Sequence, residues 1–124
     1  MLVPLQSARR RWRPAALGAA LVLLAAVPAI ACSATTLDEI EPVRASEVEL
    51  QGNRFSPRVI EVAPGTTVTW TWQGGSVLHD VKGDGFDSGL QSSGTFRHTF
   101  SAPGTYDYEC TLHNNMTGRV IVVE

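Results

Sequence analysis

Three residues near the C-terminal end carry side chains that bind soft metal ions. Cys110, His113 and Met116 have the spacing C-x₂-H-x₂-M, so a thiolate, an imidazole and a thioether lie within seven residues. The two sulfur ligands favour copper over hard cations, and a neutral imidazole serves both Cu(I) and Cu(II). Zinc fits less well, because structural zinc sites seldom use methionine. The segment therefore predicts a copper site.

A second imidazole must come from elsewhere in the chain, and the remaining histidines are His79 and His98. His79 follows a glycine-containing loop after an expected strand at 68–72, so it can lie at a strand end and face the Cys110 loop. His98 lies in the middle of an expected strand at 96–100. A trigonal His₂Cys site with a distant Met needs only two imidazoles. We therefore expect His79 as the ligand and His98 as a packed or surface side chain.

The elements that must position these side chains are short β-strands. Alternating runs rich in Val, Thr, Tyr and Trp, bounded by Pro and Gly, are typical of an antiparallel sheet, and helical periodicity of useful length is absent. Six strands, the usual number for a small single-domain sandwich, are expected at 48–50, 59–62, 68–72, 96–100, 106–110 and 120–123. Period two places Tyr106, Tyr108 and Cys110 on one face.

Other residues of this region have structural interpretations. Trp70 and Trp72 share a face with Val68 in the alternating strand, so core packing is the default for at least one of them. Tyr106 is expected to form a tyrosine corner. The glycine-rich segment 83–89 lacks the acidic spacing and terminal Glu of an EF-hand loop, so a flexible turn is favoured over a calcium site.

Residues 1–31 have the layout of a secretory signal peptide. A basic cluster at 9–13 precedes an apolar stretch at 15–27, and Ala29-Ile30-Ala31 matches a small-residue cleavage site. An uncleaved anchor is the alternative, because the apolar run to Ala31 falls just below the ~18 residues of a spanning helix. The arginine run also resembles a twin-arginine signal, so the general secretory and twin-arginine routes both stay open.

Cys32 directly follows this cleavage site and resembles the lipobox cysteine of bacterial lipoproteins, which is lipidated and becomes the new N-terminus. Ala29 stands where that family usually has Leu, and ordinary cleavage at the same place would release a soluble protein. We favour lipidation, because the chain has only two cysteines and chance placement of one at this junction is improbable. The expected location is the periplasm or the outer face of the cytoplasmic membrane.

Residues 32–45 are expected to be the anchor cysteine and a flexible linker, which extended would reach about 45 Å. Residues 46–124 form the single expected domain. Four of the ten basic residues precede Cys32 and all twelve acidic residues follow it, so the chain from Cys32 onward carries six basic against twelve acidic groups, a net charge of −6. This balance argues against binding to nucleic acid and favours a basic partner.

Residues 47–124 resemble the plastocyanin/azurin family of cupredoxins, small type 1 copper proteins. The similarity rests on Phe55-Ser56-Pro57, the segments 62–70 and 100–106, His79-Asp80-Val81 and C-x₂-H-x₂-M. The gap between His113 and Met116 matches the short ligand loops of the amicyanins and pseudoazurins. The resemblance implies a Greek-key β-sandwich and one copper ion. It also implies His79, Cys110 and His113 as equatorial ligands and Met116 as the weak axial ligand.

Two residues depart from the family pattern. Asp80 stands where the family often has Asn, and an ionised carboxylate accepts hydrogen bonds but cannot donate them. The sequence therefore leaves open how the two ligand-bearing loops are joined. Leu112 replaces the Pro that short-loop members often have before the second histidine, which loosens the loop and enlarges an apolar rim beside His113.

These observations favour a monomeric one-electron carrier that exchanges electrons with redox proteins, such as a basic cytochrome, outside the cytoplasm. We expect electrons to pass at the edge of His113, where Leu112, Val77 and Leu78 form an apolar docking patch. An enzyme is not expected, because the ligand set leaves no open position for a substrate and no nucleophile has a base partner. The alternatives are a periplasmic copper-binding or delivery protein and a metal-free interaction module.

Overall fold

The computed structural model describes residues 34–124. The predicted signal segment 1–31 and the predicted lipidation site Cys32 lie outside the described residues. Within 34–124 no helix has the length and apolar character needed to cross a membrane.

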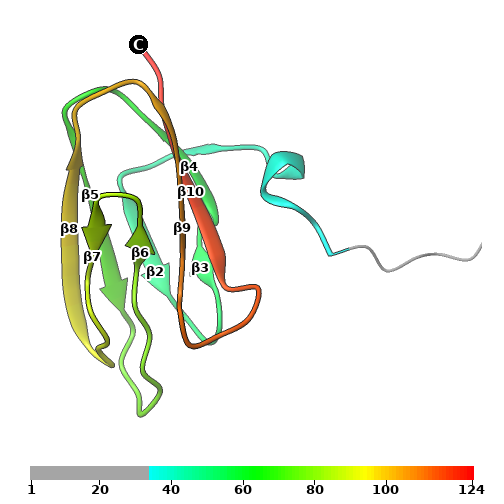
Figure 1. The fold of residues 1–124 in the computed structure, drawn as a ribbon, viewed down its shortest axis with the longest axis vertical. Coiled ribbons are helices and arrows are strands. Elements are labelled where there is room, and N and C mark those ends of the chain that lie inside the picture. The colour runs from blue at the N-terminus through cyan, green and yellow to red at the C-terminus, as the bar shows by residue number, and fades with distance from the viewer. Residues whose placement is uncertain (1–33) are drawn as a thin grey trace, which may run out of the picture. The chain divides into compact units, whose positions relative to one another are not determined.

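The described chain is almost entirely β-structure, as predicted, with one turn of 3-10 helix (Figure 1). The elements are η1 (Leu37–Glu39), β1 (Val43–Arg44), β2 (Glu47–Leu50), β3 (Phe55–Ser56), β4 (Val59–Val62), β5 (Thr66–Trp72), β6 (Lys82–Gly83), β7 (Phe86–Asp87), β8 (Gly94–Phe100), β9 (Gly104–Glu109) and β10 (Thr117–Val122). The six expected strands correspond to β2, β4, β5, β8, β9 and β10. The other four have two residues each, too few for alternation to register in a sequence.

The strands form two sheets, with the orders β1-β4-β10-β9-β6-β7 and β3-β2-β5-β8. The predicted all-β sandwich is therefore confirmed, but the strand pattern, read as typical of an antiparallel sheet, did not reveal that both sheets also contain parallel pairs. Strand β2 runs parallel to β5, and β4 runs parallel to both β1 and β10. Alternation reports only which face is buried, whereas the direction of a neighbouring strand depends on where the chain crosses between sheets.

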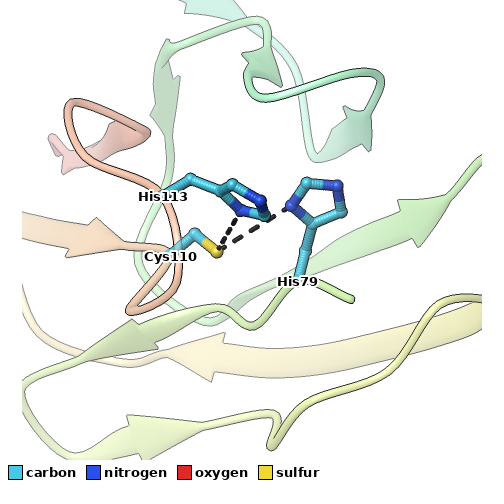
Figure 2. A group of neighbouring side chains, drawn as sticks. All are labelled: His79, Cys110 and His113. Carbon is cyan, nitrogen blue, oxygen red and sulfur yellow. Dashed lines mark hydrogen bonds between the residues drawn. The ribbon is translucent and has the colours of Figure 1, made fainter. Parts of the chain in front are cut away.

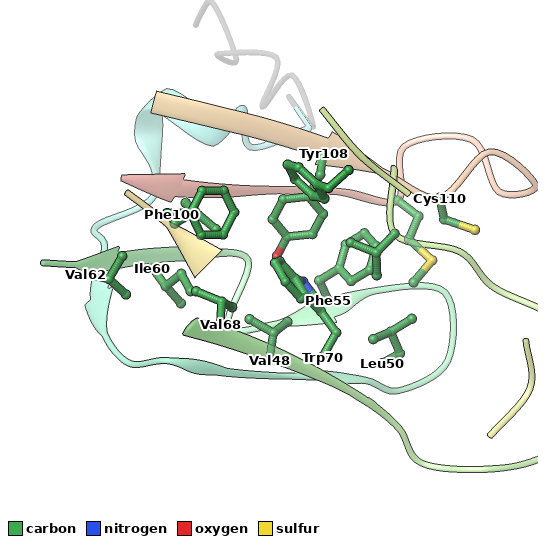
Figure 3. Packing of buried hydrophobic residues seen from close by; sticks show 14 of the residues in the cluster. Val48, Leu50, Phe55, Ile60, Val62, Val68, Trp70, Phe100, Tyr108 and Cys110 are labelled. Carbon is green, nitrogen blue, oxygen red and sulfur yellow. The ribbon is translucent and has the colours of Figure 1, made fainter. Parts of the chain in front are cut away.

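The core lies between the sheets because alternate residues of each long strand point inward. In β5, Val68, Trp70 and Trp72 are all buried, which confirms the expectation that at least one of the two tryptophans packs in the core and shows that both do. Figure 3 shows the hydrophobic cluster running from Val62 at one end to Cys110 at the other. The Cys110 thiol thus lies at one end of the packed hydrophobic core, which excludes water.

Two local predictions meet different outcomes. The Tyr106 hydroxyl donates a hydrogen bond of 2.8 Å to the carbonyl of Ala102, which confirms the tyrosine corner. The segment 83–89 is more ordered than the expected flexible turn: β6 and β7 pair as a hairpin, and Phe86 is buried against the core. Burial of that aromatic ring anchors the hairpin.

Residues 34–45, the described part of the expected flexible linker, are packed against the domain. Strand β1 pairs with β4, and η1 is held against β10 by the Arg119 guanidinium, which bonds Asp38 and Asp107. Arg58 donates to the carbonyl of Thr35 at 3.4 Å and to the Thr117 hydroxyl at 2.9 Å. Polar side chains far along the sequence thus dock a segment that has no apolar periodicity of its own.

The connections that carry the predicted metal-binding residues lie at one end of the sandwich. In Figure 1, the chain that leaves β5 and the connection from β9 to β10 both occupy the lower end of the view. The first connection carries His79, and the second carries Cys110, His113 and Met116.

We expect Gly118→Ala to lower the free energy of unfolding by about 1–3 kcal/mol, the usual cost of overpacking. Gly118 in β10 pairs with Tyr108 in β9, and a Cβ atom at this position would collide with the buried Tyr108 ring. Urea denaturation of the metal-free protein measures the change, with the exposed Ser93→Ala as the control. A Gly118→Ala curve that overlays that of the wild type would contradict this account of β9–β10 packing.

We expect Arg119→Gln to reduce the loss of stability in acid. A hydrogen bond from the Arg119 guanidinium holds the pKa of Asp107 below its usual range, against a smaller opposing effect of burial. Because the pKa is depressed in the folded state, the stabilisation is present above the unfolded pKa of about 3.9 and is lost as the pH falls through the folded value. Urea denaturation between about pH 5 and pH 2 tests this. Equal pH dependence in wild type, Arg119→Gln and the control Arg97→Gln would contradict it.

Candidate metal centre

Three predicted ligands meet at the end of the core. The donor atoms of His79, Cys110 and His113 all lie within 4.8 Å of one another. The Nδ1 atoms of the two histidines lie 3.8 Å and 3.4 Å from the Cys110 Sγ atom (Figure 2). The sequence prediction that His79 and the Cys110 loop face the same end of the sandwich is borne out by this convergence.

These distances fit a small trigonal metal ion. Metal–sulfur and metal–nitrogen bonds of about 2.3 and 2.0 Å, the lengths found for zinc, separate sulfur from nitrogen by about 3.7 Å at an angle of 120°. The observed separations of 3.8 and 3.4 Å bracket that value. One thiolate and two imidazoles are also the donor types expected of a trigonal copper site. The residues present therefore fit copper.

Core side chains shield two of the three potential donors, Cys110 and His79, from water. Cys110 is 3% exposed and His79 is 6% exposed, whereas His113 is partly exposed. Burial lowers the pKa of His79 from 6.5, its neighbour His113 lowers it further, and Asp80 opposes both effects. His79 is therefore neutral at pH 7, with the nitrogen lone pair that a metal requires.

His79 is held by contacts that involve its backbone. It exchanges two hydrogen bonds of 3.0 Å with Gln91, and the indole N–H of Trp72 donates to its carbonyl at 3.3 Å. Trp72 is buried at the end of β5, so the strand that precedes the loop also helps to fix the position of His79. The sequence placed Trp72 on the same strand face as Val68 but gave no signal for this contact, because only the folded loop brings His79 back to the indole.

The second segment, from Cys110 to Met116, is a tight loop closed by backbone hydrogen bonds. The N–H of Cys110 donates to the carbonyl of Met116 at 2.9 Å, and the N–H of Met116 donates to the carbonyl of His113 at 3.2 Å. Asn115 has a φ of 64°, a left-handed conformation that Asn tolerates better than most residues. The Met116 side chain is 1% exposed and belongs to the hydrophobic core.

Asp80 joins the two segments. Its Oδ1 atom accepts the backbone N–H of Thr111 at 2.6 Å, and its Oδ2 atom accepts the Thr111 hydroxyl at 2.7 Å. The sequence left open how the two loops are joined when Asp replaces Asn at position 80. The structure answers this: Asp80, which follows His79, accepts two hydrogen bonds from Thr111, which follows Cys110. Sequence reasoning had no signal that Thr111 would be the donor, since the two residues are 31 positions apart.

His98 lies apart from the metal-binding group, as predicted. It is partly buried in β8, and its ring stacks on Phe86 with centroids 4.8 Å apart. Within residues 34–124, the His, Cys, Asp and Glu side chains that lie close enough together to hold a metal ion are His79, Cys110 and His113.

Comparisons with known proteins agree with this geometry. No family model matches the sequence. The chain is 34% identical over 121 residues to amicyanin-alpha of Methylorubrum extorquens, covering 89% of this chain and 98% of that protein. It also matches the solved structure of a purple cupredoxin from Nitrosopumilus maritimus, with 30% identity, a TM-score of 0.57 and coverage of 64% and 100% of the two chains. The chain belongs to the cupredoxin family.

This cupredoxin is a blue-copper electron-transfer protein with one copper site, so the predictions of family, copper and electron transfer are confirmed. A copper-containing nitrite reductase from Thermus scotoductus is also similar, with 29% identity and a TM-score of 0.58 over 68% of this chain. The match covers only 23% of the reductase chain, so the likeness is to one part of a larger enzyme.

Proposed function

We propose that His79, Cys110 and His113 hold the copper ion, with Met116 as the weak axial ligand, and that the protein is a carrier rather than an enzyme. The observation that carries this proposal is the convergence of both Nδ1 atoms on the Cys110 sulfur. When bound, copper supplies a centre that takes up and releases one electron. Three strong donors and a thioether leave no coordination position for a substrate.

The chain's own contribution is a fixed donor arrangement. His79 is held by Gln91 and Trp72, and Cys110 is held by Met116. A trigonal arrangement of this kind suits both oxidation states, so little rearrangement opposes electron transfer. Burial of the Cys110 thiol among core side chains keeps water from the donors.

The proposed route for electrons is the partly exposed His113. Three exposed apolar side chains adjoin the ligands in sequence: Leu112 is 52% exposed beside His113, and Val77 and Leu78 are 51% and 45% exposed just before His79. The two histidine rings lie only 4.6 Å apart, so the residues that precede them in sequence lie at the same end of the sandwich. Sequence reasoning missed Leu90, also half exposed, whose neighbour Gln91 pairs with His79.

The proposed setting is outside the cytoplasm. It is supported by the signal-like segment 1–31 and by Cys32 as a candidate lipidation site, with release of a soluble form as the alternative. The net charge of −6 from Cys32 onward favours a basic redox protein, such as a basic cytochrome, as the partner of a monomeric carrier. Charge complementarity of this kind raises the association rate more than the affinity.

Loading the protein with Cu(II) should produce a strong blue absorption band that bleaches on reduction, returns on oxidation and is absent in Cys110→Ser. The band requires the Cys110 thiolate, which the serine hydroxyl cannot replace at neutral pH. His98→Ala is the matched control, because His98 lies outside the donor group, and it should retain the band.

Reversible bleaching together with retention of copper against a moderate chelator is required of an electron carrier. Copper that exchanges freely with the chelator would favour the copper-delivery alternative. A protein that retains no copper would contradict the ligand assignment and leave the interaction module.

Leu112→Asp should slow electron transfer to a basic cytochrome by about tenfold, since an unpaired carboxylate in an apolar contact costs on the order of 1.4 kcal/mol or more. Stopped-flow absorbance at several ionic strengths measures the rate. Val123→Asp is the control: Val123 is 39% exposed, and its N–H bonds Val62 at the opposite end of the core from Cys110. Equal rates in the two variants would count against docking at Leu112.

A further inference from the structure

The Arg58 side chain is bonded to the residue at which the Cys110–Met116 loop ends. Its Nε atom donates to the carbonyl of Thr117 at 3.3 Å, and its Nη2 atom donates to the Thr117 hydroxyl at 2.9 Å. Thr117 directly follows Met116 and is the first residue of β10. A third N–H, on Nη1, donates to the carbonyl of Thr35 at 3.4 Å. One partly buried guanidinium thus holds both the carbonyl and the hydroxyl of the residue after Met116.

The guanidinium extends the contact between β4 and β10 beyond the end of their ladder. The parallel pairing of these strands begins with Val59 opposite Arg119, and the Arg119 N–H donates to the Arg58 carbonyl at 2.8 Å (Figure 1). Thr117 lies two residues before that point and has no partner in β4. On its other side it pairs with Glu109, the last residue of β9. The Arg58 side chain therefore supplies, on one side of the loop's base, hydrogen bonds that a strand would otherwise supply.

Arg58 bonds neutral oxygens rather than carboxylates. Among the ion pairs of residues 34–124 none includes Arg58, although twelve acidic residues follow Cys32. Two of its donors instead meet oxygens of a single residue, Thr117. The rigid fork of a guanidinium suits two acceptors held close together, whereas a lysine ammonium is a point charge on a flexible stem. The arrangement is therefore suited to fixing a position rather than to balancing a charge.

We propose that Arg58 is a positioning residue for the copper site and acts on Met116 through Thr117. The inference rests on the proposed ligand set, in which Met116 is the axial ligand. The Met116 N–H and carbonyl bond within the loop, and its side chain is buried in the core. Holding the next residue restricts the chain on the remaining side, so the thioether is kept in one position. The axial ligand tunes the reduction potential of a site of this type, so its position matters for electron transfer.

The principal variant is Arg58→Lys, which keeps the positive charge but loses the fork. We expect copper to leave this variant about tenfold faster than the wild type, the ratio that corresponds to the loss of one hydrogen bond of ordinary strength. The loss of blue absorption in excess chelator measures the rate. Arg44→Lys is the matched control, because Arg44 pairs with Glu61 and not with the loop. Equal rates in wild type and Arg58→Lys overturn the proposal.

A second control separates the loop from overall stability. Val120 is fully buried in β10, so Val120→Ala leaves a cavity in the core of the same strand without removing an acceptor of Arg58. We expect this variant to unfold at lower urea concentration but to release copper at about the wild-type rate in the absence of denaturant. If Val120→Ala and Arg58→Lys release copper equally fast, release follows global unfolding, and the positioning role is overturned.

The reduction potential tests whether Arg58 acts through Met116. Because Arg58→Lys keeps the charge, we expect a shift of its potential away from the wild type to report the position of the axial ligand. Met116→Leu removes the thioether while it fills a similar volume. In the Met116→Leu background, Arg58→Lys should therefore cause no further shift. Equal shifts in the two backgrounds, or no shift in either, overturn the proposal.

The copper-free protein gives a readout that does not depend on the ligand assignment. Hydrogen exchange at the Met116 amide, which donates to the His113 carbonyl, should be faster in Arg58→Lys and unchanged in Thr117→Ser, which keeps the hydroxyl acceptor. Thr117→Val lacks that acceptor and should also exchange faster, which provides the test if Arg58→Lys does not fold. Unchanged exchange in Arg58→Lys and Thr117→Val overturns the role of Arg58. Absence of blue absorption in the wild type would instead overturn the proposed ligand set.

Discussion

The contact between Asp80 and Thr111 is the constraint on which the metal-binding end of the molecule depends. His79 and Cys110 belong to different parts of the chain, and donors from two separate segments stay in register only if something joins those segments. A buried carboxylate that accepts both the N–H and the hydroxyl of one residue fixes position and orientation together, because two bonds from one group resist rotation.

The rest of the sandwich supports this contact from the core side. The hydrophobic cluster ends at Cys110, and Trp72, the last residue of β5, contacts the carbonyl of His79. The segment that carries His79 follows β5, and the segment that begins at Cys110 follows β9. Because each strand end is packed in the core, the first residues of each segment are held in place. The loop itself is closed by backbone bonds among Cys110, His113 and Met116, which replace the rigidity that a proline at position 112 would supply.

Charged side chains organise the N-terminal part of the described chain. Arg119 links Asp38 to Asp107, and Arg58 links Thr35 to Thr117. Nothing in the composition of 34–45 distinguishes it from a linker, because the guanidinium groups that hold it, those of Arg58 and Arg119, are distant in the sequence. A segment docked by polar contacts looks in sequence like one that is free, since both lack apolar periodicity.

The sequence by itself determined the all-β class and the inward faces of the long strands, because period-two alternation is a local pattern. It also predicted that His79 lies beside Cys110 and His113, which the structure brings together. The burial of at least one of Trp70 and Trp72 and the Tyr106 corner were also predicted from sequence. Only the tertiary structure decided the parallel pairing of β2 with β5, the docking of 34–45 and the partner of Asp80. Each of these depends on residues far apart in the chain, whose meeting is set by the path of the backbone between the two sheets.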